Sequence, residues 1–177
     1  MVGRGEWGWL PINPYVSIPL IILVAVSQST LAPHLTIWGA KPDLMLLAVA
    51  SWSLLGRASE GVLWSALGGL VLDLLSGVPF GANTVALGLI AGLTRLVFMN
   101  VFRLSIVMPL AAAGVSTVVY YVVLLLGLRL SGESVVWADA VLRVVIPSVV
   151  VNTAVMPVVF GGVRWLHKHT GPEEIGW

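Results

Sequence analysis

Long apolar stretches, separated by short polar or glycine- and proline-containing connections, dominate this sequence. A helix that crosses a membrane needs roughly 20 mostly apolar residues, and fewer where flanking side chains reach the interface. The pattern therefore predicts an all-α, polytopic membrane protein whose six transmembrane helices form a compact bundle. The predicted helices cover residues 15–31, 43–55, 59–75, 83–98, 105–128 and 138–165.

These helices make up one predicted transmembrane domain, residues 14–166, between an N-terminal interfacial segment, 1–13, and a C-terminal cytoplasmic tail, 167–177. The connections between helices are too short to hold a soluble catalytic domain. We expect no cleavable secretion signal, because the first 13 residues are mixed in polarity and no small-residue cleavage site follows a short apolar core.

The composition supports lipid as the solvent. Hydrophobic residues make up 58% of the chain and charged residues 10%, with a mean hydropathy of +1.00, whereas a soluble domain carries about 25% charged residues. The net charge of +1 predicts no nucleic-acid partner, and the absence of cysteine excludes disulfides and thiolate metal sites. No paired carboxylates, histidine cluster or activated nucleophile is evident, so we expect no catalytic residue, metal site or cofactor.

The distribution of Lys and Arg predicts the orientation, since these residues accumulate in cytoplasmic connections. With the amino terminus inside, six basic residues fall on the cytoplasmic side and three outside. Both termini are therefore predicted to be cytoplasmic. The inner set is Arg4, Arg57, Arg95, Arg103, Arg164 and Lys168, and the outer set is Lys41, Arg129 and Arg143.

One carboxylate, Asp73, lies among leucines in the third predicted helix. Its helical neighbours include Gly69 and Gly77, and small residues of this kind let helices pack closely in a bilayer. A carboxylate within a membrane should face protein and find a partner, so we expect Asp73 to bond either to Arg143 or to the turn 76–83. A packing role is the preferred interpretation, with a ligand or proton site and a partner contact as alternatives. The predicted packing motif also includes Gly68, Gly88 and Gly92.

The segment after Asp73 predicts a rigid hairpin between the third and fourth helices, over residues 76–83. Gly77 can adopt positive φ and close the helix, and Pro79 cannot continue one. Gly81 permits a second tight bend before Asn83, which we expect to cap the next helix.

Two more polar residues lie within predicted helices. Gln28 is part of a polar end of the first helix, where interhelical hydrogen bonding is preferred over partner binding as the interpretation. Asn152 lies between Pro147 and Pro157, each of which removes a backbone hydrogen bond. A freed carbonyl is one candidate partner for its side chain, and a purely structural role is the preferred interpretation.

Taken in order, these motifs resemble the rod shape-determining protein MreD family. The family pattern has a Gln near the end of the first helix, a Pro-Asp pair that opens the second, a glycine-rich third helix that ends in Leu-Asp-Leu, and a Gly-x-Pro-x-Gly turn. The matching positions are Gln28, Pro42, Asp43, Gly61, Gly68, Gly69, Leu72, Asp73, Leu74, Gly77, Pro79 and Gly81.

The resemblance implies a non-enzymatic subunit of the cell-elongation machinery in the bacterial cytoplasmic membrane. Such a subunit would pair with the single-span protein MreC and help to link MreB filaments to RodA and a class B penicillin-binding protein. Gln28, Pro42 and Asp43 are possible partner contacts.

The family is also similar in fold to the six-helix S-components of energy-coupling-factor vitamin transporters, which supplies the alternative function. That function needs an outward cavity with convergent polar and aromatic groups. The candidates for its lining are Gln28, Asn83, Asp73 and Trp137, with Tyr120 and Tyr121 expected to lie deeper.

Overall fold

The computed structural model describes residues 14–30, 36, 39–56, 58–98 and 107–170. This part of the chain is helical and contains no β-strand. The predicted segment 1–13 and residues 171–177 of the predicted tail lie outside the described residues. The elements are α1 (Pro14–Thr30), α2 (Leu44–Leu55), α3 (Ala58–Leu75), α4 (Ala82–Leu93), the π-helical turn η2 (Thr94–Phe98), α5 (Val107–Leu130), α6 (Trp137–Ala140), the π-helical turn η3 (Val141–Val145) and α7 (Ile146–Thr170).

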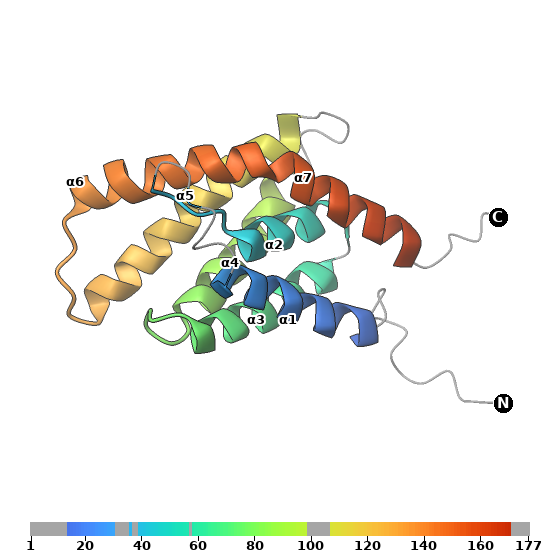
Figure 1. The fold of residues 1–177 in the computed structure, drawn as a ribbon, viewed down its shortest axis with the longest axis horizontal. Helices are drawn as coiled ribbons and strands as arrows, with labels where there is room; N and C mark the ends of the chain where they lie inside the picture. Colours follow the sequence, from blue (N-terminus) through green and yellow to red (C-terminus); the bar gives the residue numbers. More distant parts are fainter. Residues whose placement is uncertain (1–13, 31–35, 37–38, 57, 99–106, 171–177) are drawn as a thin grey trace.

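The helices match the six predicted segments, because η2 continues α4 and because α6, η3 and α7 follow one another without a break. Successive helices run in alternate directions along the long axis of the molecule (Figure 1). As a result, the start of α1 and the end of α7 lie at the same end (Figure 1).

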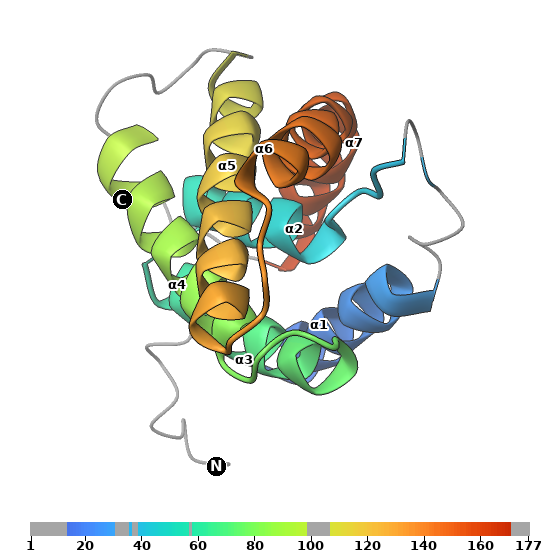
Figure 2. The same cartoon turned by 90° about the vertical axis from the view of Figure 1, so that its left-hand side faces the viewer.

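The short helix α2 forms the centre of the bundle. It contacts α1, α3, α4, α5 and α7, and Figure 2 shows it enclosed by them. All nine residues from Met45 to Ser53 are buried, as expected for a helix that is apolar on every side. Its 12 residues span about 18 Å, which is less than the roughly 30 Å hydrocarbon core of a bilayer.

Two glycines of α3 allow its neighbours to approach closely. A Cβ atom on Gly68 would lie 2.6 Å from the sulfur of Met45 in α2. A Cβ atom on Gly69 would collide with the Cα atom of Thr84 in α4. The backbones of α3 and α4 therefore approach closely at Gly69, whereas at Gly68 the side chain of Met45 from α2 packs against α3.

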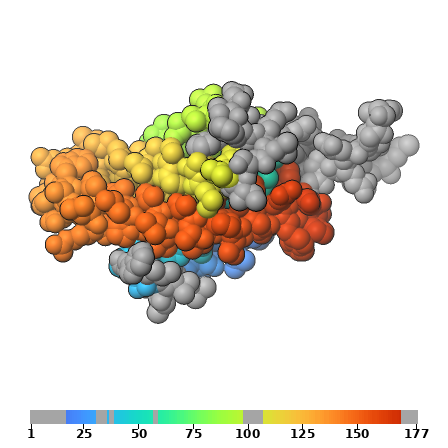
Figure 3. All heavy atoms as spheres, turned by 90° about the horizontal axis from the view of Figure 1, so that it is seen from above, coloured from blue at the N-terminus to red at the C-terminus, as the bar shows by residue number. Residues whose placement is uncertain are grey.

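The outer helices expose apolar surface. Among the described residues, α5 and the continuous helix Trp137–His169 are long and apolar enough to cross a membrane. Only 28% of the most apolar window of each is buried, whereas the core helix of a soluble protein is mostly buried. These two helices lie side by side along one face (Figure 3). The apolar helices Ser17–Thr30, Leu44–Leu55 and Ala82–Val97 are shorter.

The conformation of Gly77 and the surroundings of Gly88 and Gly92 differ from the prediction. Gly81, with φ +92°, is left-handed and leads directly into α4, whereas Gly77 is not among the glycines with positive φ. The left-handed residue of this turn thus stands next to α4 rather than at the end of α3. Gly88 and Gly92 are exposed, and an added Cβ would meet no atom of the described residues within 4 Å. They do not pack against the described part of the chain, because the buried face of α4 carries Asn83, Ala86, Leu87, Ile90 and Ala91 instead.

Candidate functional site

The carboxylate of Asp73 caps the N-terminus of α4 from the neighbouring helix α3. Its Oδ1 accepts hydrogen bonds from the backbone N–H (2.9 Å) and the side-chain amide (3.0 Å) of Asn83. Its Oδ2 accepts hydrogen bonds from the backbone N–H (3.2 Å) and the hydroxyl (2.6 Å) of Thr84. The first N–H groups of a helix have no intrahelical partner, and Gly81 at the N-cap has no side chain to offer. Asp73 supplies the missing acceptor together with a favourable negative charge.

Of the two partners expected for Asp73, the structure shows the turn and not Arg143. Arg143 instead pairs with Asp139 on its own helix at 3.4 Å, and both side chains are largely exposed. Asn83 was predicted to cap α4, and this prediction was wrong, because the helix begins at Ala82 after Gly81. Asn83 is therefore already inside the first turn, where its backbone and side-chain amides both bind Asp73.

Asn83 extends the contact of Asp73 to a third helix. Its side-chain amide also donates to Ser76 Oγ at 2.9 Å, and its Oδ1 accepts a hydrogen bond from the hydroxyl of Tyr120 in α5 at 2.6 Å. Asn83 and Asp73 are 2% and 5% exposed. A buried, fully bonded polar group of this kind fixes the relative positions of α3, α4 and α5.

The N-terminus of α2 is held in the same way, by side chains from two other helices. Gln28 of α1 accepts a hydrogen bond through Oε1 from the backbone N–H of Met45 at 2.7 Å. Asn152 of α7 accepts one through Oδ1 from the backbone N–H of Asp43 at 2.8 Å. Gln28 thus makes the interhelical bond that its sequence position suggested.

The side chain of Asp43, only 3% exposed, completes this second cluster. Its Oδ2 accepts hydrogen bonds from the hydroxyl of Tyr121 at 2.8 Å and from the amide of Asn152 at 3.1 Å. Asn152 also donates to Thr117 Oγ1 at 3.2 Å. A carbonyl freed by a proline is not the partner of Asn152, because its side chain points to α2 and α5 and all of its polar atoms are used there.

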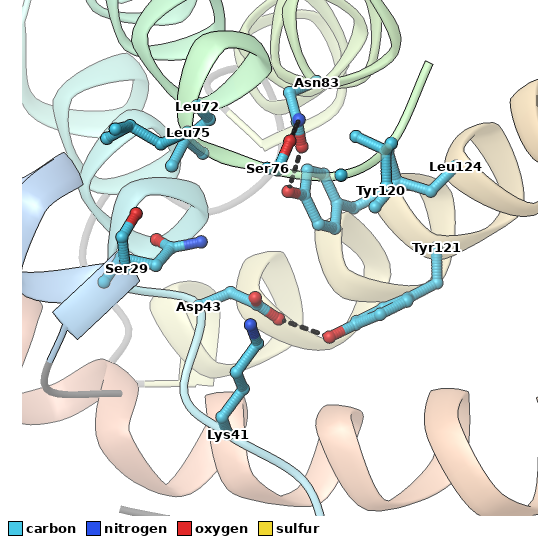
Figure 4. Close-up of a pocket in the computed structure, with 13 residues that line it drawn as sticks. Ser29, Lys41, Asp43, Leu72, Leu75, Ser76, Asn83, Tyr120, Tyr121 and Leu124 are labelled. Carbon is cyan, nitrogen blue, oxygen red and sulfur yellow. Dashed lines mark hydrogen bonds between the residues drawn. The ribbon is translucent and has the colours of Figure 1, made fainter. Parts of the chain in front are cut away.

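A polar pocket of about 380 Å³ lies between the two clusters (Figure 4). The sequence pointed to Gln28 and Asn83 in its lining. Asp73 lies behind Asn83 and does not line the pocket, and Trp137 lines a separate apolar groove beside α5. The lining residues are Gln28, Ser29, Lys41, Asp43, Leu72, Leu75, Ser76, Gly77, Val78, Asn83, Tyr120, Tyr121 and Leu124.

Two tyrosines that were expected to lie deeper than the other candidate lining residues both line the pocket. Tyr120 and Tyr121 are adjacent in α5, with rings 5.5 Å apart and nearly perpendicular. One hydroxyl reaches each polar cluster, so the pair forms the wall between them (Figure 4). Adjacent phenols within an otherwise apolar helix were the available signal, because a buried hydroxyl requires a hydrogen-bond partner.

The arrangement suits binding. Polar side chains of α1, α4, α5 and the segments that precede α2 and follow α3 converge on one cavity. Its volume lies in the range of about 300–1,000 Å³ that is common for small-molecule pockets. In the part of the chain that the structure describes, no three His, Asp, Glu or Cys side chains are grouped to hold a metal ion.

Comparison with protein families gives a match over most of the chain. A family model described as rod shape-determining protein MreD matches residues 11–165. No curated protein matches the chain, and no solved structure does. The matched range contains both polar clusters and every residue that lines the pocket.

Proposed function

This chain belongs to the rod shape-determining protein MreD family, and from that membership we propose that it is a non-enzymatic membrane subunit of the bacterial cell-elongation complex. In this proposal it scaffolds an MreC-like single-span protein. Through that partner it links the peptidoglycan synthases, RodA and a class B penicillin-binding protein, to cytoplasmic MreB. The family match over residues 11–165 is the observation that carries the proposal.

We propose that the six helices cross the cytoplasmic membrane with both termini inside. The alternating helix directions and the shared end of α1 and α7 support an even number of crossings (Figure 1). The shorter helices α2 and α4 are compatible with this arrangement, because protein side chains satisfy their N-terminal N–H groups and irregular backbone is tolerated where protein buries it.

The absence of cysteine makes this topology directly testable. A single cysteine at Ser131, between α5 and α6, should react with a membrane-impermeant maleimide in intact cells. A cysteine at Lys168, near the end of α7, should react only after the membrane is permeabilised. Equal reactivity of both positions in intact cells would contradict an inside location for the end of α7.

We propose that the partner helix packs on the outward face of α4. Gly88 and Gly92 are four residues apart there, both are exposed, and no atom of the described chain occupies the space where their Cβ atoms would be. Exposed Val85 and Leu89 flank them, at 57% and 52% exposure. Small residues at this spacing allow two transmembrane helices to approach closely.

Co-purification with an MreC-like protein from membranes tests the scaffold function. Gly88→Leu and Gly92→Leu should reduce the amount of partner recovered. Gly161→Leu is the matched control, because Gly161 of α7 is also exposed and an added Cβ there would meet none of the residues that the structure describes within 4 Å. A chain that purifies alone in mild detergent would count against the scaffold as a whole, whereas equal effects of all three substitutions would count only against the α4 face.

The vitamin-transporter alternative is favoured by one observation, the polar pocket with its two tyrosines. It would make this chain a substrate-binding subunit similar to an S-component. A rise in melting temperature with one member of a vitamin panel would support this alternative, and no shift across the panel would remove it.

A further inference from the structure

The polar pocket is lined by two side chains of opposite charge, Lys41 and Asp43. Lys41 and Asp43 are two residues apart in the segment that precedes α2, and both line the cavity. Figure 4 shows the ammonium group of Lys41 directed toward the carboxylate of Asp43. Asp43 is buried, whereas Lys41 is exposed. The pocket therefore has a carboxylate in its interior and an ammonium group at its accessible side.

The interior of the pocket retains free hydrogen-bonding atoms. Asp43 uses Oδ2 for Tyr121 and Asn152, and its Oδ1 accepts no hydrogen bond from the described residues. Gln28 uses Oε1 for the N–H of Met45, and its Nε2 donates none to that part of the chain. Because both side chains line the cavity, one acceptor with negative charge and one amide donor remain available to a ligand.

We propose that this pocket binds a zwitterionic group that carries a primary ammonium and an anion. The ammonium donates to Asp43 Oδ1, and the anion accepts hydrogen bonds from Lys41 Nζ and Gln28 Nε2. A ligand with a single charge would lie close to a protein charge of its own sign, because an anion would meet Asp43 and a cation would meet Lys41. A zwitterion compensates both charges and gains two charge-assisted contacts.

The rest of the lining suits an amphiphile. Leu72, Leu75, Val78 and Leu124 line the same cavity, and they give apolar contact to carbon atoms attached to the charged group. Two sources share this chemistry: the headgroup of a phospholipid with a primary amine, such as phosphatidylethanolamine, and a free zwitterion, such as phosphoethanolamine. The inference concerns the pocket alone and does not depend on the scaffold function.

Binding to the purified full chain separates these sources. In one arm, the chain is exchanged into nanodiscs that contain phosphatidylethanolamine or phosphatidylcholine, and lipid that remains bound after detergent extraction is counted by native mass spectrometry. In the other arm, free phosphoethanolamine is titrated by calorimetry. Retention of phosphatidylethanolamine alone identifies the headgroup as the source, whereas binding of the free compound identifies a soluble zwitterion.

Variants connect the binding to the pocket. Lys41→Gln removes the cation at an exposed position and should weaken binding about tenfold, as expected for the loss of one charge-assisted hydrogen bond. Leu75→Trp should fill the cavity and abolish binding. Leu74→Trp is the matched control, because Leu74 is the adjacent residue, is 70% exposed and does not line the pocket.

Three results would overturn the proposal. The first is no binding in either arm. The second is equal retention of phosphatidylcholine, whose quaternary ammonium has no N–H to donate to Asp43. The third is binding that Lys41→Gln and Leu75→Trp leave unchanged.

Discussion

Replacing Asp73 with alanine tests the contribution of the carboxylate that caps α4. The substitution leaves the backbone N–H groups of Asn83 and Thr84 without their acceptor. Each buried donor that loses its partner costs about 1–3 kcal/mol. Two such groups predict that Asp73→Ala lowers the free energy of unfolding by about 3 kcal/mol, with most of the effect at the junction of α3 and α4.

The assay is unfolding of the full chain in mixed micelles by increasing SDS, followed by far-ultraviolet circular dichroism. Asp139→Ala is the control, because it also removes a carboxylate but breaks only the exposed pair with Arg143, which should cost about 0.5 kcal/mol. If Asp73→Ala destabilises the protein no more than Asp139→Ala, the carboxylate does not hold α4 and the capping argument is wrong.

The same unfolding assay checks two further predictions, and hydrogen exchange checks a third. Gly69→Ala should cost about 2 kcal/mol, because the new Cβ collides with the backbone of Thr84. At Gly88 an added Cβ meets none of the described residues within 4 Å, so Gly88→Ala should be neutral or slightly stabilising. Equal losses of stability in the two variants would contradict the packing. Tyr120→Phe should cost about 1–3 kcal/mol, since Oδ1 of buried Asn83 loses its donor, and an unchanged midpoint would contradict this. Gln28→Leu should leave the N–H of Met45 unpaired and speed its hydrogen exchange, whereas unchanged exchange would show that Gln28 is not its acceptor.

The helices were predictable because their signal is local. Long apolar runs with proline, glycine and polar breaks determine where each helix starts and stops, and the boundaries agree with the described elements to within a few residues. The partner of Asp73 could be predicted for the same reason. Asn83 is only ten residues away along the chain, across a hairpin whose breakers are visible in the sequence.

The second polar cluster was not predictable, because its members are distant in the sequence. Asp43 and Asn152 are separated by 109 residues, and no periodicity within α2 or α7 shows that they meet. The rotation of each helix about its axis caused the remaining errors. Glycines on α3 and α4 look alike in sequence, but Gly69 faces a neighbouring backbone and Gly88 faces outward, and only the packed bundle decides between these outcomes.

The burial of α2 has a consequence for how the protein is made. Asp43, at the start of this helix, bonds to a residue of α7 that leaves the ribosome 109 residues later. Until then the backbone N–H of Asp43 lacks its hydrogen-bond acceptor, Asn152. The part of the apolar surface of α2 that α7 covers is also without protein contact. The central helix is therefore fully enclosed only once α7 has been made, so a polypeptide truncated before α7 should be cleared by membrane proteases rather than accumulate as a smaller bundle.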